Sequence, residues 1–165
     1  KQETTPTWYG VFLPTGEETE VIDNLQQMWS GQYPENRSPH INSLKIDGKE
    51  ALENVYLRPG KSYTIVADIT DPEKESMLFQ WQILESEFGL TGSGGDAEGI
   101  PDPIKIKVAK GTPHQLEPET LSVTVEDNGT LSFKAPSKVG AYRFFIYARD
   151  GNGNAATANI PFYVK

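Results

Sequence analysis

The sequence contains no cysteine and only two histidines among its 165 residues. The absence of cysteine excludes disulfide bonds, thiol nucleophiles and thiolate metal sites. It does not exclude an exported protein, because a chain of this length can bury enough surface to fold without covalent cross-links. His40 and His114 each follow a proline, and neither belongs to an HExxH motif or accompanies a Gly-x-Ser-x-Gly elbow. The sequence therefore predicts that this chain is not an enzyme.

Basic residues and long apolar runs are also scarce. The chain has 15 Lys and Arg against 23 Asp and Glu, which gives a formal net charge of −8. A nucleic-acid partner is not expected, because phosphate neutralisation requires clustered Lys and Arg. Membrane insertion is not expected either, because no apolar run approaches the roughly 18 residues of a membrane span. The opening Lys1-Gln2-Glu3 has no signal-peptide character, and we interpret the chain as a piece of a larger protein.

Residues 1–38 differ in pattern from the rest and are predicted to form a strand-helix extension with a linker. Residues 7–13 read as a short apolar strand, and residues 19–29 as the one convincing helix, with Thr19 as N-cap and Gly31 as its C-terminal stop. A helix of about three turns is not stable alone in water. We therefore expect its apolar stripe to pack on the sandwich or on a further domain, or to leave a patch that favours dimerisation. The stripe consists of Val21, Ile22, Leu25, Met28 and Trp29.

In residues 39–165, apolar and polar residues alternate with a period of two. This pattern predicts an immunoglobulin-like antiparallel β-sandwich. Asp127-Asn128-Gly129 indicates a hairpin between the strands on either side. The alternation places Phe79, Trp81 and Ile83 on one buried face and assigns Tyr142, Phe144 and Ile146 to the core. The predicted strands are 41–46, 63–69, 78–84, 104–108, 121–125, 130–133, 141–148 and 155–164.

Four stretches of this second region resemble the polycystic-kidney-disease-type (PKD) and cadherin-like branch of immunoglobulin-like folds. They are Val66-Ala67-Asp68-Ile69-Thr70-Asp71-Pro72-Glu73, Leu78-Phe79-Gln80-Trp81-Gln82-Ile83, Phe133-Lys134-Ala135-Pro136 followed by Gly140-Ala141-Tyr142-Arg143, and Ala148-Arg149-Asp150-Gly151-Asn152-Gly153-Asn154-Ala155. The sequence departs from the family pattern in a long insertion at residues 85–118. Members of this family serve adhesion, spacing and ligand binding, so the resemblance implies a fold more than a function.

Residues 8–39 resemble the end of a (β/α)8-barrel glycoside hydrolase and its junction with a C-terminal sandwich. The residues that carry this likeness are Trp8 to Phe12, Gly16 to Thr19 and Trp29 to Pro39. The resemblance implies an accessory module of a secreted bacterial enzyme, located outside the cell, in the periplasm or at the cell surface. It also implies a parent catalytic domain in cis as partner, with a role as spacer, stabiliser or weak glycan binder. No residue here corresponds to the catalytic carboxylates of such a barrel. A dedicated carbohydrate-binding module and a cell-surface adhesion or protein-interaction module remain alternatives.

No cofactor is expected other than calcium, whose hard-cation chemistry favours several oxygen ligands. Asp68, Asp71, Glu73 and Glu75 surround one turn, and the loop of Asp150 could approach them at one end of the sandwich. The alternative is that these are ordinary turn residues, and no Asp-x-Asp-x-Asp-Gly loop occurs. The calcium ligands of this hypothesis are Asp68, Asp71, Glu73 and Asp150.

Polysaccharide is the other candidate ligand, since sugars stack on exposed aromatic rings. Five aromatic residues lie outside the predicted sandwich strands and are therefore candidates for glycan contact. For the first four, the favoured alternative is that they fix the helix to the sandwich or to the parent domain. The five are Trp8, Tyr9, Trp29, Tyr33 and Phe88.

Overall fold

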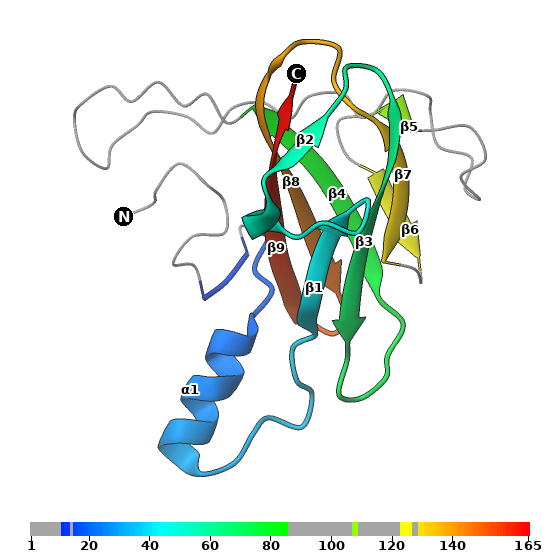
Figure 1. Cartoon of the computed structure of the whole chain (residues 1–165). Helices are drawn as coiled ribbons and strands as arrows, with labels where there is room; N and C mark the ends of the chain where they lie inside the picture. Colours follow the sequence, from blue (N-terminus) through cyan, green and yellow to red (C-terminus); the bar gives the residue numbers. More distant parts are fainter. Residues whose placement is uncertain (1–10, 14, 86–106, 109–122, 127–128) are drawn as a thin grey trace.

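The computed structural model describes residues 11–13, 15–85, 107–108, 123–126 and 129–165. These residues form two β-sheets packed face to face, with one helix projecting from an end of the sandwich (Figure 1). The elements are α1 (Glu20–Ser30), β1 (His40–Ile46), a 3-10 turn η1 (Ala51–Glu53), β2 (Val55–Leu57), β3 (Ser62–Thr70), β4 (Leu78–Glu85), β5 (Lys107–Val108), β6 (Val123–Glu126), β7 (Thr130–Lys134), β8 (Gly140–Arg149) and β9 (Ala155–Val164).

The two sheets confirm the predicted mainly-β sandwich. One sheet has the strand order β1-β3-β7-β5 and the other the order β2-β9-β8-β4-β6. The described pairings between these strands are antiparallel except that of β2 with β9, which is parallel. The short strand β2 and the turn η1 were not among the predicted elements. Residues 104–106 and 121–122, which complete two predicted strands, lie outside the described residues.

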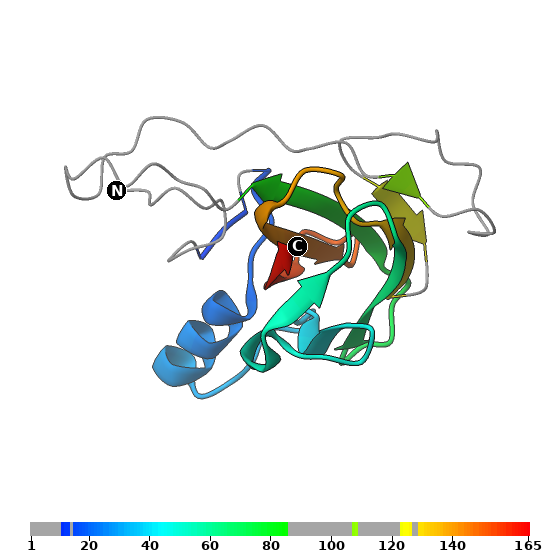
Figure 2. The ribbon, with the colours of Figure 1, turned by 45° about the horizontal axis from the view of Figure 1, so that its top comes forward.

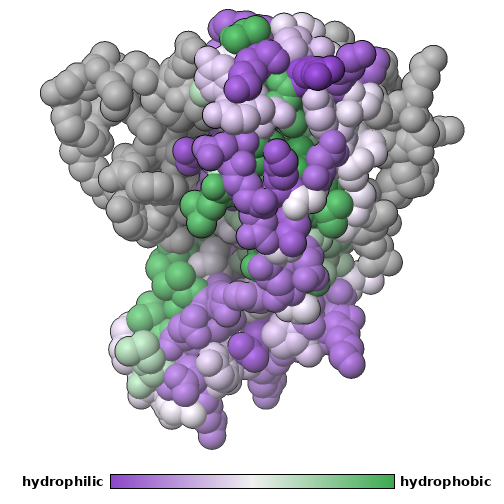
Figure 3. Space-filling model, viewed as in Figure 1, coloured by the Kyte–Doolittle hydropathy of each residue, from purple (hydrophilic) through white to green (hydrophobic). Residues whose placement is uncertain are grey.

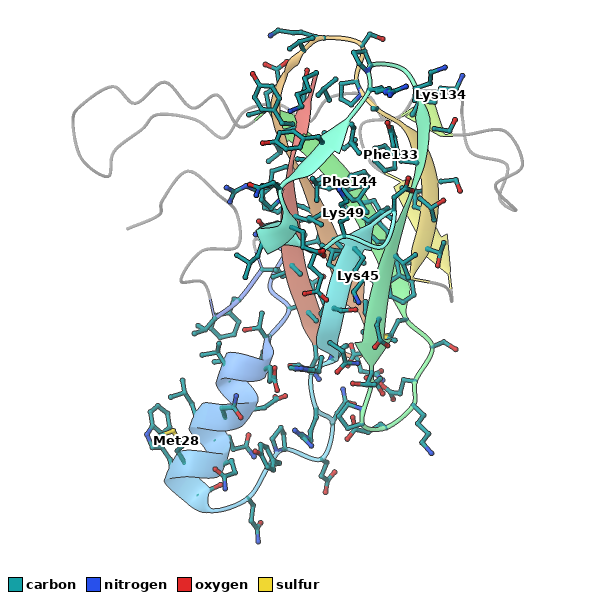
Figure 4. The ribbon with its side chains drawn as sticks, viewed as in Figure 1. Met28, Lys45, Lys49, Phe133, Lys134 and Phe144 are labelled. Carbon is teal, nitrogen blue, oxygen red and sulfur yellow. The ribbon has the colours of Figure 1, made fainter. Side chains whose placement is uncertain are left out.

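The core lies between the sheets and follows the predicted alternation. Trp81 and Phe144 are fully buried, with their rings edge to face at a centroid distance of 5.7 Å. Phe133 of β7 meets Phe144 of β8 across the sandwich at 4.8 Å, so the two sheets contact each other through these rings (Figure 4). Phe79, Ile83, Tyr142 and Ile146 are buried as well. The prediction that these side chains form the core is confirmed.

The hairpin predicted at Asp127-Asn128-Gly129 is wrong. β6 pairs with β4 in one sheet, whereas β7 pairs with β3 and β5 in the other, so the chain changes sheet between them. Gly129 fits this crossover because a Cβ atom there would overlap the carbonyl oxygen of Ala67. Asn-Gly favours a tight turn, but the same glycine also allows the close backbone approach that a crossover needs.

The N-terminal segment of the described chain covers the outer face of the five-stranded sheet. Leu13 is buried there beside Leu84, Phe145 and Tyr147. Glu18 is bonded to the turn between β8 and β9: its amide donates to the carbonyl of Gly153 at 2.8 Å, and its carbonyl accepts from Ala155 at 2.8 Å. The sandwich thus has a second, smaller apolar cluster outside its main core.

α1 spans Glu20–Ser30, one residue later than the predicted 19–29, and it is flanked by the predicted Thr19 and Gly31. Thr19 has extended backbone at the N-cap, but its hydroxyl donates to the carbonyl of Val11 at 3.1 Å and makes no capping hydrogen bond. Gly31 ends the helix in the left-handed region with φ of 78°, and its amide donates to Gln27 at 2.9 Å. In Figure 2, where the top of Figure 1 is turned toward the viewer, the helix lies to one side of both sheets.

Candidate interaction surface

The apolar stripe of α1 is largely exposed. Val21 is 47% exposed, Met28 74% and Trp29 80%, whereas the one buried side chain of the helix is Asp23 at 1%. Leu25 lies on the same side, one helical turn from Val21, and is half-buried. We call Val21, Leu25, Met28 and Trp29 the α1 face. Figure 3 shows apolar side chains gathered along the outer side of α1, and Met28 points away from the sandwich in Figure 4.

The polar side of α1 turns inward because the linker supplies hydrogen-bond donors there. The amide of Ser38 donates to Oδ2 of Asp23 at 2.7 Å, and this bond is buried. Nδ1 of His40 lies 2.9 Å from Oε2 of Glu20, which joins the start of β1 to the first turn of the helix. These contacts fix the helix with its apolar side toward solvent. The sequence predicted the stripe but not the role of Asp23, because an aspartate in a helix is ordinarily expected to be exposed to solvent.

Of the five aromatic candidates for glycan contact, the structure describes Trp29 and Tyr33. Both are exposed, Tyr33 at 45%. The guanidinium of Arg37 lies 4.2 Å from the centre of the Tyr33 ring, so one side of that ring is occupied by a cation. Trp8, Tyr9 and Phe88 lie outside the described residues. Glycan contact by these aromatics stays a prediction.

The acidic turn between β3 and β4 lies at the same end of the sandwich as α1. Oε2 of Glu73 accepts from the amide of Arg37 at 3.2 Å, and Oε1 of Glu75 accepts from the Asn152 side chain at 2.7 Å. Oδ1 of Asp71 accepts from the amide of Glu75 at 2.9 Å. The structure therefore brings the turn, the linker and the β8–β9 turn together through hydrogen bonds to carboxylates.

Asp150 is the centre of this arrangement. Its side chain is buried, and Oδ2 accepts from Nδ2 of Asn36 at 2.8 Å. Oδ1 accepts from the amides of Asn152 at 2.7 Å and Asn154 at 3.0 Å, which shapes the turn between β8 and β9. Asp150 thus joins the linker to the last two strands. The sequence singled out this residue as a metal ligand, but Asn36 was not recognised as its partner.

The proposed calcium ligands are only partly brought together. Asp71, Glu73 and Asp150 lie at one end of the sandwich, while Asp68 is an exposed residue of β3 paired with Ser43. Oδ2 of Asp71 and Oε2 of Glu75 are buried, and neither has a hydrogen-bond partner in the described part of the chain. Within the described ranges, no group of three or more His, Asp or Glu side chains is placed to hold a metal ion. Calcium binding stays a prediction.

Glu17 forms an ion pair that ties the N-terminal segment to β8. Its Oε1 accepts from Nε of Arg149 at 2.7 Å, and both side chains are 19% exposed. Burial by itself would raise the pKa of Glu17, but hydrogen bonds from Thr15, the backbone and Arg149 lower that pKa below its ordinary value. The contact is a second attachment of residues 11–18 to the sandwich.

The sequence matches no protein-family model and no curated protein. Among solved structures, it is similar to the reeler domain of human F-spondin, with 12% identity and a TM-score of 0.39 over 73% of this chain and 87% of that one. It is also similar to the soluble domain of PmoD from Methylocystis sp. ATCC 49242 (Rockwell), with 12% identity and a TM-score of 0.34 over 81% of this chain and 95% of that one.

No helix within the described part of the chain is long and apolar enough to cross a membrane.

Proposed function

We propose that this chain is a non-catalytic accessory module of a secreted bacterial glycoside hydrolase, and that the α1 face docks on the parent catalytic domain. One observation carries the docking proposal: an eleven-residue helix presents its apolar side to solvent while its polar side faces its own linker. An exposed stripe of this kind marks an interaction site. The PKD-like sandwich stretches and the junction-like residues 29–39 support the choice of parent enzyme.

The attachment of α1 suits a docking role. The buried bond from Ser38 to Asp23 and the contact between Glu20 and His40 hold the helix by its polar side. A helix fixed in this way presents Met28 and Trp29 in a set orientation, so less conformational entropy is lost on association. Burial of a tryptophan and a methionine would also supply the apolar area typical of the centre of an interface.

The open reading frame that encodes residues 1–165 provides the first test. A (β/α)8-barrel domain encoded in the same frame on the N-terminal side supports the assignment. A frame that encodes this sandwich with no such domain contradicts it.

The second test asks whether the α1 face is the contact. The whole polypeptide is prepared with Trp29→Glu and Met28→Glu, and with Leu52→Glu as the matched control. Leu52 is 96% exposed in the turn η1 and therefore should tolerate a charge. We expect calorimetry to show the module and its neighbour unfolding as one unit in the wild type and the control, and separately in the α1 variants. Joint unfolding in every variant would contradict docking through this face.

A further inference from the structure

A surface cavity of about 300 Å³ lies on the outer side of β2, β9 and β8. This volume is at the lower end of the range for small-molecule sites. Its lining includes residues of β2 and of the last part of β9, and β2 and the C-terminus lie at the end of the sandwich opposite to α1 (Figure 1). The residues that line it include Asn54, Tyr56, Ala141, Arg143, Pro161 and Tyr163.

The strand register explains how these side chains share one surface. Tyr56 of β2 pairs with Tyr163 of β9, which in turn pairs with Ala141 of β8. The next row pairs Pro161 with Arg143. Because alternate residues of these strands are buried in the core, both tyrosines turn outward, with exposures of 52% and 42%. Small Ala141 therefore leaves a hollow between a pair of exposed rings and an arginine.

Arg143 is the one charged residue among the described residues that line this cavity. Its Nε is buried and has no hydrogen-bond partner among the residues that the structure describes. Arg149, six residues later on the same side of β8, illustrates the usual solution, since its Nε donates to Oε1 of Glu17 at 2.7 Å. Buried polar atoms ordinarily have partners, so this guanidinium keeps unused hydrogen-bonding capacity in the wall of the cavity, where it can pair with an anion bound there.

We propose that this cavity binds an anionic glycan, with Tyr56 and Tyr163 stacking on sugar rings and Arg143 pairing with a hexuronate carboxylate. Tyrosine offers an apolar ring with a polar edge, which suits the apolar faces and hydroxyl rims of a pyranose. The planar guanidinium matches a carboxylate through two parallel hydrogen bonds. Asn54, at the start of β2, adds an amide at the rim.

The charges around the cavity favour an anion, although the whole chain carries a net charge of −8. No acidic residue of the described chain lines the cavity. Nζ of Lys165 lies 3.4 Å from the centre of the Tyr56 ring, so a second cation stands beside the site. That ammonium covers one face of Tyr56 and leaves Tyr163 as the principal stacking surface.

Binding is tested by titration calorimetry on the whole chain with galacturonate, glucuronate and mannuronate oligomers. Their methyl esters serve as matched neutral ligands, because esterification removes the charge and keeps the sugar backbone. We expect at least one of the three acids to bind, and its ester to bind at least tenfold more weakly. Failure of all three acids to bind would overturn the proposal, as would equal affinity for acid and ester. A sulfated glycan that binds more tightly than every uronate would overturn the choice of carboxylate.

Variants then assign the contacts. Arg143→Gln should abolish the difference between acid and ester, whereas Tyr163→Ala should weaken both ligands about tenfold. Arg58→Gln and Phe12→Ala remove an exposed arginine and an exposed aromatic ring outside the cavity and should leave affinity unchanged. Tyr56→Ala repeats the stacking test should Tyr163→Ala fail to fold. An unchanged affinity in folded Arg143→Gln, or losses of equal size in the controls, would refute the site.

This inference goes beyond the docking function and stands independently of it. The cavity variants leave the α1 face unaltered, and the α1 variants leave the cavity unaltered. Retained uronate binding in Trp29→Glu, together with loss of joint unfolding, would separate the two surfaces.

Discussion

Arg149 and Glu17 stand 132 positions apart in the chain, yet Nε of the arginine donates to Oε1 of the glutamate at 2.7 Å. The pair joins the N-terminal segment to the end of β8. Arg149 also donates to Oε1 of Gln80 on β4 at 2.9 Å, so one guanidinium connects three parts of the chain. Such a contact couples the extension to the sandwich and makes it sensitive to pH.

Glu17→Gln should reduce stability at neutral pH by about 1 kcal/mol, because it removes a partly buried, charge-assisted hydrogen bond. The pKa of Glu17 is lowered in the folded protein, so its ionised form stabilises the fold above the unfolded-state pKa, and this stabilisation is lost as pH falls through the folded pKa. The difference in unfolding free energy between wild type and variant, measured by urea unfolding, should therefore shrink as pH falls below the ordinary pKa of a glutamate. Glu35→Gln, at an exposed position, is the control; equal behaviour of the two variants would contradict this role.

A buried and an exposed tryptophan allow the packing of the core to be tested by matched alanine substitutions. Trp81 is fully buried against Phe144, whereas Trp29 is 80% exposed. Trp81→Ala should lower the free energy of unfolding by about 3–5 kcal/mol, because it creates a core cavity. Trp29→Ala should change it by less than about 0.5 kcal/mol. Denaturant melts measure both values, and a mild effect at Trp81 would mean that the buried face has been assigned incorrectly.

Asp150→Ala should destabilise the fold by about 2–3 kcal/mol, because the buried carboxylate accepts from Asn36 and from two backbone amides of its own turn. Asp68→Ala, at an exposed position of β3, is the control and should be nearly neutral. Thermal unfolding compares the two variants. Similar midpoints for both would show that Asp150 does not connect the linker to the sandwich.

The calcium hypothesis is tested by the same unfolding measurement. A site at the acidic turn would stabilise the fold by about 2.7 kcal/mol at a hundredfold excess of calcium over its dissociation constant. EDTA should reverse the gain, and Asp71→Asn should remove it. A melting curve that responds to neither calcium nor EDTA contradicts the hypothesis.

Deletion of residues 1–38 tests the predicted boundary between extension and sandwich. We expect the deletion to destabilise the remainder, because it uncovers Phe145, Tyr147 and Leu84 around the site of Leu13. Leu13→Ala should reproduce part of this loss, at about 2–3 kcal/mol. Phe12→Ala, at an exposed neighbour, should not. An equally stable and soluble fragment 39–165 would establish the boundary at residue 38.

The sandwich could be predicted because burial repeats along its strands with the period of the backbone. Trp81 and Phe144 fall on the buried side of that period, and the structure confirms both. The hairpin at residue 129 could not be predicted correctly, since the same glycine serves a turn within one sheet or a crossover between two. Contacts between distant segments determine which strands pair, and the local sequence pattern contains no information about these contacts.

The candidate sites were harder to predict, because contacts between distant segments of the chain determine them as well. The stripe of α1 was visible in the sequence, but its direction depends on Asp23 and the amide of Ser38. The sequence did not show that Tyr56 and Arg143 share a surface, because they come together only through the parallel pairing of β2 with β9 and the antiparallel pairing of β9 with β8. The alternating run Val55–Leu57 was the one local sign of an outward tyrosine.

The linker enters β1 at one end of the sandwich, and β9 finishes at the other (Figure 1). A stretching force applied between α1 and Lys165 would act along the strands and load the hydrogen bonds between β8 and β9 in shear. Ten residues of each strand are paired, so these bonds would share the load instead of opening one after another. Under such a force the two strands would separate only if many of these bonds broke together.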